Sequence, residues 1–125
     1  MSNDFIRRIK NEITRAEHAS EDILAQIEEE LEANPSAQLW ILRGDAIQLS
    51  DVDDEDMDEA EASYRQALEL DPNSAEAYES LGHFTLDMND DPLAAAEYFR
   101  RAIALGAGKS AKEGLKEAEA ELADQ

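Results

Sequence analysis

The chain has 125 residues, of which 31 are Asp or Glu and 11 are Lys or Arg, so its formal net charge is −20. This length supports one domain with a modest core, and the lack of cysteine excludes disulfides, thiolate metal sites and a cysteine nucleophile. An acidic surface repels phosphate backbones, which argues against nucleic acid as a partner.

The acidic residues are concentrated in the middle of the chain. Residues 21–91 hold 22 acids and two bases, whereas the rest of the chain holds nine of each. We expect such a surface to attract basic partners and to speed their encounter with the protein. Two simpler interpretations stay open: the charge keeps the protein soluble, or it reflects a host adapted to high salt.

Residues 4–35 predict a first pair of helices. In residues 4–18, apolar side chains recur at helical spacing. Ser20 is the expected N-cap of the second helix, which ends near Asn34-Pro35. Charged residues are spread over the first twenty positions without an apolar stretch, so we expect no signal peptide, no membrane span and a cytoplasmic location.

Residues 36–72 predict a second helix pair. Its first helix begins at Ser36, an acidic turn follows, and its second helix runs from about residue 54–56 to Leu70.

Residues 74–106 predict a third pair, in which Ser74 caps the first helix and Asp91 caps the second. A last helix is predicted over residues 110–124. Its start carries the two residues of a capping box, Ser110 and Glu113.

One pattern of aromatic, glycine and alanine residues occurs in both of the last two pairs. The first copy is Trp40, Gly44, Ala60, Tyr64, Ala67 and Pro72. The second copy is Tyr78, Gly82, Ala95, Phe99 and Ala102. Each ring has an alanine one helical turn to either side, and each glycine allows a neighbouring helix to approach closely.

On these residues the chain resembles the tetratricopeptide repeat family, whose unit is a helix–turn–helix of about 34 residues. The resemblance implies an all-α fold, a tetratricopeptide-like right-handed α-solenoid of about seven antiparallel helices. It makes residues 1–125 a single helical-repeat domain, with 4–35 as a degenerate N-terminal pair and 110–124 as the C-terminal capping helix. Arg43 departs from the family, which has a leucine before the glycine, as Leu81 in the second copy.

The resemblance also implies which residues face a partner, because the first helix of each repeat lines a concave face in this family. The corresponding residues of the first copy are Ile41, Asp45, Gln48 and Leu49. Those of the second copy are Glu76, Glu79, His83, Leu86 and Asp87. Family members that bind acidic C-terminal peptides use Lys, Asn and Arg at such positions. None of these residue types occurs at the nine positions named here. We therefore expect this groove to bind a peptide with Lys or Arg and apolar anchors, and His83 to make binding pH-dependent.

No motif predicts catalysis. In the acidic turn 51–59, a calcium loop starting at Asp51 has Asp56 where a glycine is required, although weak divalent binding stays open. The glycines near residue 108 lack the first glycine of a phosphate loop, since Ile103 occupies that position. We expect no catalytic residue, no metal site and no cofactor, and hence no enzyme.

Three hypotheses about function follow. The first is a non-catalytic protein–protein interaction module that binds a basic protein or peptide segment through an acidic concave groove, without nucleic acid or membrane partners. The second is an immunity protein, inhibitor or secretion chaperone that masks a basic toxin or effector. The third is a homo-oligomeric assembly module, in which the N-terminal pair docks on the C-terminal helix of another copy.

Overall fold

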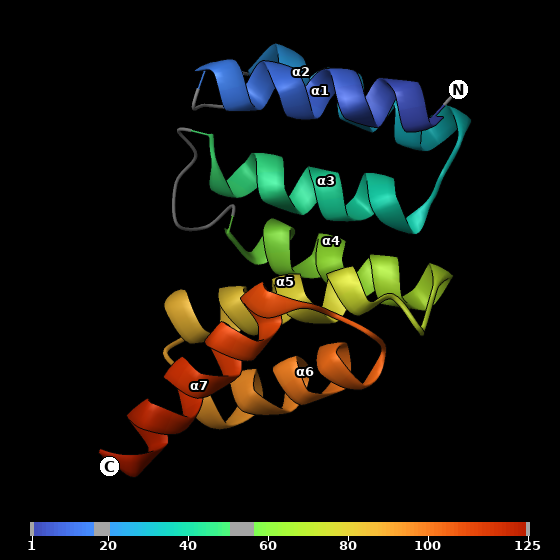
Figure 1. Ribbon diagram of the computed structural model, residues 1–125. Coiled ribbons are helices and arrows are strands. Elements are labelled where there is room, and N and C mark those ends of the chain that lie inside the picture. The colour runs from blue at the N-terminus through green and yellow to red at the C-terminus, as the bar shows by residue number, and fades with distance from the viewer. Residues whose placement is uncertain (1, 17–20, 51–56, 125) are drawn as a thin grey trace. The chain divides into compact units, whose positions relative to one another are not determined.

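The computed structural model describes residues 2–16, 21–50 and 57–124. These residues form seven α-helices and no strand, which confirms the all-α prediction (Figure 1). The helices are α1 (Ser2–Ala16), α2 (Glu21–Ala33), α3 (Ala37–Gln48), α4 (Met57–Leu70), α5 (Ala75–Asp87), α6 (Pro92–Ala104) and α7 (Lys109–Ala123). None of the helices in the described ranges is both long enough and apolar enough to cross a lipid bilayer.

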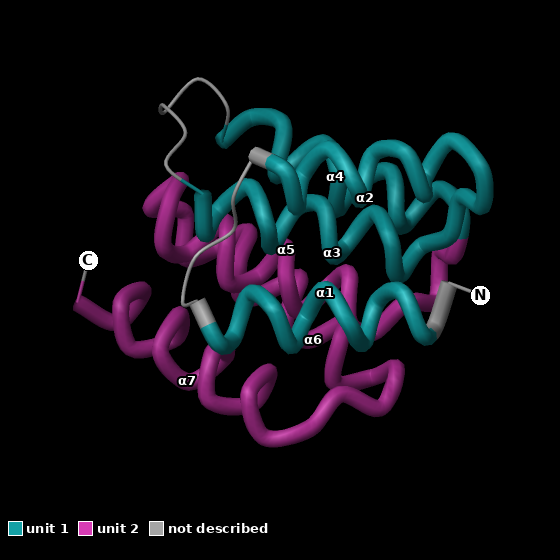
Figure 2. Tube along the Cα trace, turned by 90° about the horizontal axis from the view of Figure 1, so that it is seen from above, with its two compact units in different colours: residues 1–70 teal, residues 71–125 magenta. Residues whose placement is uncertain are grey.

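The chain divides into two compact units, which Figure 2 shows in different colours. Unit 1 is Met1–Leu70 and contains α1 to α4, and unit 2 is Asp71–Gln125 and contains α5 to α7. The division falls after Leu70, close to the predicted boundary between the helix pairs 36–72 and 74–106. The single domain over residues 1–125 remains a prediction.

In unit 1, helices α1, α2 and α3 share one hydrophobic core. Each contributes three buried residues, spaced so that they lie on one face of their helix. These residues are Ile6, Ile9 and Ile13, then Ile23, Ile27 and Leu31, then Leu39, Leu42 and Ala46. Helix α4 packs against α3, with the ring of Tyr64 against Gly44.

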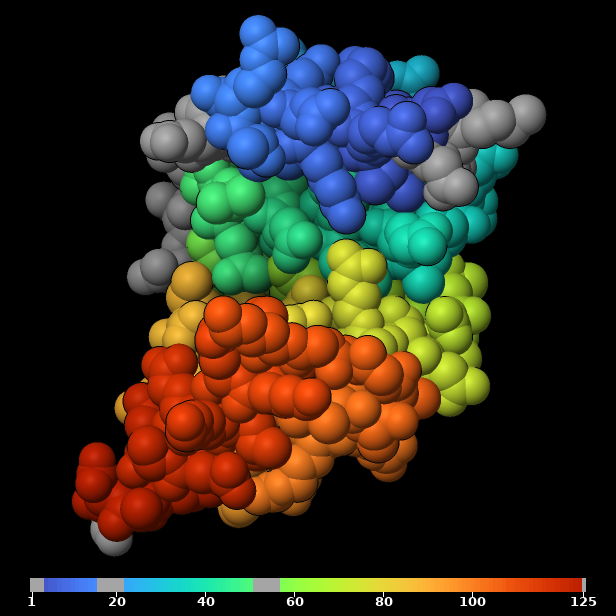
Figure 3. All heavy atoms as spheres, viewed as in Figure 1, coloured from blue at the N-terminus to red at the C-terminus, as the bar shows by residue number. Residues whose placement is uncertain are grey.

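In unit 2, helices α5, α6 and α7 pack around Phe99. The buried cluster consists mostly of alanines, which let the three helices approach one another closely. Its members are Leu86, Ala95, Ala96, Phe99, Ala102, Ala111 and Ala118. Figure 3 shows α7, in red, lying over the near side of the other helices of this unit.

The predicted N-caps Ser74 and Asp91 are confirmed, and Ser36, where a helix was predicted to begin, is the N-cap of α3. The side chains of Ser36, Ser74 and Asp91 accept hydrogen bonds from the backbone N–H groups three residues ahead, each at 3.1 Å. A cap of this kind stabilises a helix by about 1 kcal/mol.

The predicted capping box at Ser110 and Glu113 is wrong. Helix α7 begins at Lys109, its N-cap is Gly108, and no side chain caps it. Because Ser110 lies inside the first turn of the helix, its hydroxyl points elsewhere and pairs with the imidazole Nε2 of His83 at 3.1 Å.

Several predicted helix ends differ from the structure or lie outside the described residues. Helix α1 begins at Ser2 rather than at residue 4, and α7 covers 109–123 rather than 110–124. Ser20 and the predicted start of a helix at 54–56 lie outside the described residues, as does the acidic turn up to residue 56.

Candidate functional site

In unit 1, two of the predicted partner-facing residues hold the hydroxyl of a buried tyrosine. Tyr64 on α4 is fully buried. Its hydroxyl donates to Oδ1 of Asp45 at 2.6 Å and accepts from Nε2 of Gln48 at 2.6 Å. Since an unpaired buried hydroxyl costs free energy, Asp45 and Gln48 on α3 stabilise the packing of α3 against α4.

The position of Tyr64 also changes its acid–base chemistry. Burial raises the pKa of Tyr64 far above its ordinary value of 10.0, and the neighbouring carboxylate of Asp45 raises it further. The phenol is therefore a neutral hydrogen-bonding group in the physiological range of pH.

The two aliphatic candidates of unit 1 differ in their exposure. Ile41 is only 2% exposed, whereas Leu49, at the C-cap of α3, is 47% exposed. Leu49 is therefore available as an apolar contact for a partner, and Ile41 is not.

In unit 2, three of the five candidates form an acidic row on α5. Glu76 and Asp87 are exposed and Glu79 is half-buried. Their spacing of three and eight residues places them on one side of the helix. These carboxylates can accept hydrogen bonds and ion pairs from a partner.

The other two candidates of unit 2 pack against neighbouring helices of the unit. Leu86 is 4% exposed and belongs to the hydrophobic cluster around Phe99. The half-buried ring of His83 meets the ring of Phe99 edge-on at a centroid distance of 4.8 Å, and its Nε2 pairs with Ser110 of α7. The expectation that these two side chains line an open groove therefore needs correction: α7 packs against this part of α5.

The structure also reveals a cleft in unit 1 that the repeat pattern did not predict. It lies between α2, α3 and α4, has a volume of about 450 Å³ and combines apolar with acidic side chains. The apolar ones are Leu31, Trp40 and Ala62, and the acidic ones are Glu28, Glu32 and Glu59. Below, these residues together with Arg43 are called the Trp40 cleft.

Arg43 of α3 forms polar contacts with both of the other helices that line this cleft, α2 and α4. Its guanidinium donates to Oγ of Ser63 at 2.6 Å and pairs with Glu59 at 3.2 Å and with Glu28 at 3.4 Å. It also lies over the ring of Trp40, 5.8 Å from the ring centroid, a favourable cation–π distance. One sign of this cleft was present in the sequence: Arg43 stands where the family has a leucine, and unit 2 keeps that leucine as the buried Leu81.

The acidic side chains do not converge on a metal site. Within the ranges 2–16, 21–50 and 57–124, no group of three or more His, Cys, Asp or Glu side chains could hold a metal ion. Of the predicted acidic turn, only residues 57–59 are described, and they form the first turn of α4.

Comparison with known proteins gives one family. Residues 51–87 match the model of a family described as TPR repeat, the tetratricopeptide repeat, and this stretch includes all of α4 and α5. None of the curated proteins compared with the chain matches it significantly.

Proposed function

Because the chain belongs to the tetratricopeptide repeat family, on the match of residues 51–87, we propose that it is a non-catalytic module that binds a basic protein or peptide segment. Repeats of this family generally mediate protein–protein interactions, and they do so on many different partners. The basic character of the partner is our own inference from the charge of the chain.

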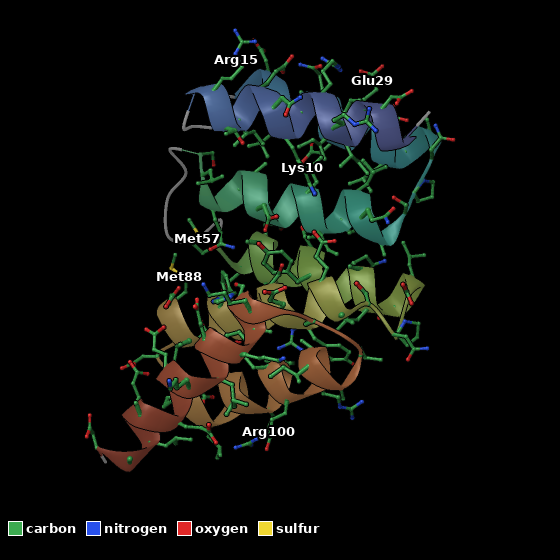
Figure 4. The ribbon with its side chains drawn as sticks, in the orientation of Figure 1. Lys10, Arg15, Glu29, Met57, Met88 and Arg100 are labelled. Atoms are coloured by element: carbon green, nitrogen blue, oxygen red, sulfur yellow. The ribbon has the colours of Figure 1, made fainter. Side chains whose placement is uncertain are left out.

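The observation that carries this proposal is that the acidic residues whose exposure the structure describes are exposed or half-buried, although Oε2 of Glu121 is itself buried. Among the described residues no Asp or Glu is buried; the buried polar residues there are Ser63 and Thr85. Charged side chains point outward from both units: Figure 4 shows Arg15 and Glu29 pointing away from α1 and α2, and Arg100 away from α6. With 22 acids against two bases, residues 21–91 carry a strongly negative net charge, which favours a cationic partner.

Within unit 2, we assign the acidic row of α5 to partner binding. Glu76, Glu79 and Asp87 lie on the helix that corresponds to the recognition helix of the family, and none of them belongs to the hydrophobic cluster around Phe99. In unit 1, Leu49 supplies exposed apolar surface near the end of α3. The acidic row of unit 2 favours Lys or Arg in a partner, and Leu49 of unit 1 favours an aliphatic residue, each as a contact within its own unit.

The test is a fluorescence anisotropy titration with a labelled peptide in which Lys alternates with Leu. A matched peptide with Glu in place of each Lys is the control. We expect the basic peptide alone to bind, with an affinity that falls at least about ten-fold between about 50 and 500 mM salt. Equal binding of both peptides, or an affinity independent of salt, would refute the basic partner.

A pair of variants tests the location of the site. The double substitution Glu79→Lys and Asp87→Lys should weaken binding by about ten-fold. Glu97→Lys with Glu117→Lys, at exposed positions of α6 and α7, changes the net charge equally and should weaken it by less than about three-fold. Asp45 is left unchanged, because its loss would remove the carboxylate to which the hydroxyl of Tyr64 donates. Equal effects of the two double variants would move the site away from α5.

A further inference from the structure

We propose that the Trp40 cleft of unit 1 binds a single Lys or Arg side chain of the protein partner. This inference rests on the proposed basic partner and adds a contact within unit 1 to the acidic row proposed on α5 of unit 2. Three properties of the cleft support it: its lining, its charge and the residue that already lies in it.

The lining suits a side chain with an aliphatic stem and a cationic head. Leu31, Trp40 and Ala62 offer apolar surface, and Glu28, Glu32 and Glu59 offer carboxylates in the same cleft. Lys and Arg bury their methylene groups along apolar surfaces while their charged ends remain paired or hydrated. A volume of about 450 Å³ leaves room for such a side chain.

Arg43 shows that the cleft can hold a guanidinium. The group lies over the ring of Trp40 and is paired with carboxylates from both flanking helices, Glu28 of α2 and Glu59 of α4. These contacts come from the same chain, but they are the contacts by which proteins recognise arginine in a partner.

The charge of the cleft is not balanced by Arg43. Three carboxylates face one guanidinium, so the lining keeps two negative charges. Glu32 is exposed and makes none of the ion pairs of Arg43, which are with Glu28 and Glu59. A second cation beside Glu32 would bring the cleft closer to neutrality.

The Trp40 cleft and the predicted concave residues occupy different sides of α3. Trp40 and Arg43 are three residues apart and lie on one side of the helix. Around the helix axis, Asp45 lies about 140–160° and Gln48 about 80–140° from these two residues, and both meet Tyr64. A ligand in the cleft therefore need not disturb the hydrogen bonds that hold Tyr64.

The experiment uses Trp40 itself as the reporter, because it is the only tryptophan of the chain. The full chain is titrated with the labelled Lys–Leu peptide, which contains no tryptophan, and both the anisotropy of the label and the emission of Trp40 are recorded. We expect the two signals to change with the same midpoint.

Three variants locate the contact. Glu32→Gln should weaken the binding of the peptide by about two- to five-fold, and Glu32→Lys by about ten-fold. Glu32→Gln preserves the size of the side chain, so it keeps the test valid if the lysine disturbs α2. Glu117→Lys, on α7 of unit 2, is the control for net charge and should leave the emission change of Trp40 intact.

The outcomes separate the two proposals. If the peptide does not bind at all, the proposed function fails. If it binds but leaves the emission of Trp40 unchanged, and Glu32→Lys weakens it no more than Glu117→Lys, the function stands and the cleft is not a site. If spermidine changes the emission as strongly as the peptide, the cleft accepts any small polycation, and its assignment to a protein side chain is overturned.

Discussion

In unit 1 the buried ring between the two helices of the repeat is a tyrosine, and in unit 2 it is a phenylalanine. The residues around each ring differ accordingly. Tyr64 has Asp45 and Gln48 on its hydroxyl. At the corresponding positions of the second copy, His83 meets the ring of Phe99 edge-on and Leu86 joins its cluster. Positions that the family uses for partners thus serve first to complete the core beneath them.

A second difference is the number of glycines against each ring. In unit 1 a Cβ added at Gly44 would lie 2.6 Å from the ring of Tyr64. In unit 2 a Cβ would lie 2.7 Å from the ring of Phe99 at Gly82 and 2.4 Å from it at Gly114. Phe99 is therefore enclosed from α5 and α7 together, which explains how a capping helix with few large side chains holds its place.

The largest expected effect comes from filling these close contacts. Gly44→Ala, Gly82→Ala and Gly114→Ala should each lower the free energy of unfolding by about 1–3 kcal/mol, because a ring without free space must move. The loss outweighs the gain of about 1 kcal/mol that alanine brings to a helix interior. Urea denaturation measures the difference, and we expect Gly114→Ala to be the most damaging.

Gly108→Ala is the control for this series, since an added Cβ there meets nothing within 4 Å. Adding Phe99→Leu to Gly114→Ala should recover part of the loss. If Gly114→Ala were as stable as Gly108→Ala, the tight enclosure of Phe99 would be disproved.

The next effect sharpens the contrast between the two rings. Tyr64→Phe should cost about 1–2 kcal/mol near neutral pH, because Asp45 and Gln48 lose their partner in a partly buried place. Differential scanning calorimetry or urea denaturation of the wild type and the variant measures this cost. A neutral result would mean that water replaces the hydroxyl at no cost.

The same substitution should change the alkaline behaviour of the protein. The pKa of Tyr64 is raised in the folded state by burial and by Asp45, so the unfolded chain loses the phenolic proton at a lower pH than the folded chain. The stability therefore falls as the pH rises above about 10, by up to about 1.4 kcal/mol per pH unit from this group. Tyr64→Phe should remove this contribution, whereas Tyr98→Phe, which keeps Tyr64, should retain it.

The smallest effect concerns the serines that precede or begin the helices of unit 2. Ser74→Ala removes the cap of α5 and should cost about 1 kcal/mol. Ser110→Ala removes only an exposed hydrogen bond to His83 and should cost less than about 0.5 kcal/mol. Thermal unfolding of the two variants under the same conditions compares them, and equal losses would restore Ser110 as a helix cap.

Much of the fold follows from local patterns in the sequence. The apolar spacing of Ile6, Ile9 and Ile13 predicts a helix with one buried face, and Ser36, Ser74 and Asp91 predict where helices start. These signals are readable because the 3.6-residue period and the N-cap bond involve residues only three or four positions apart.

The candidate site was less predictable, because it depends on which side chains meet across helices. Counting along the repeat placed Leu86 and His83 on a binding face, but it could not include α7, which packs against α5. The same count did not predict the Trp40 cleft. Its only sign in the sequence is that Arg43 stands where the family has a leucine.

The sequence by itself thus determined the all-α class, the helix pairs, the tetratricopeptide pattern and the excess of negative charge. Only the tertiary structure decided which of the acidic and polar residues are committed to the core and which remain available. Asp45 and Glu79 are both acidic residues on the first helix of a repeat, yet Asp45 accepts from a buried tyrosine in α4. The physical reason is that a hydrogen bond joins residues nineteen positions apart only after the helices have packed, so no local pattern records it.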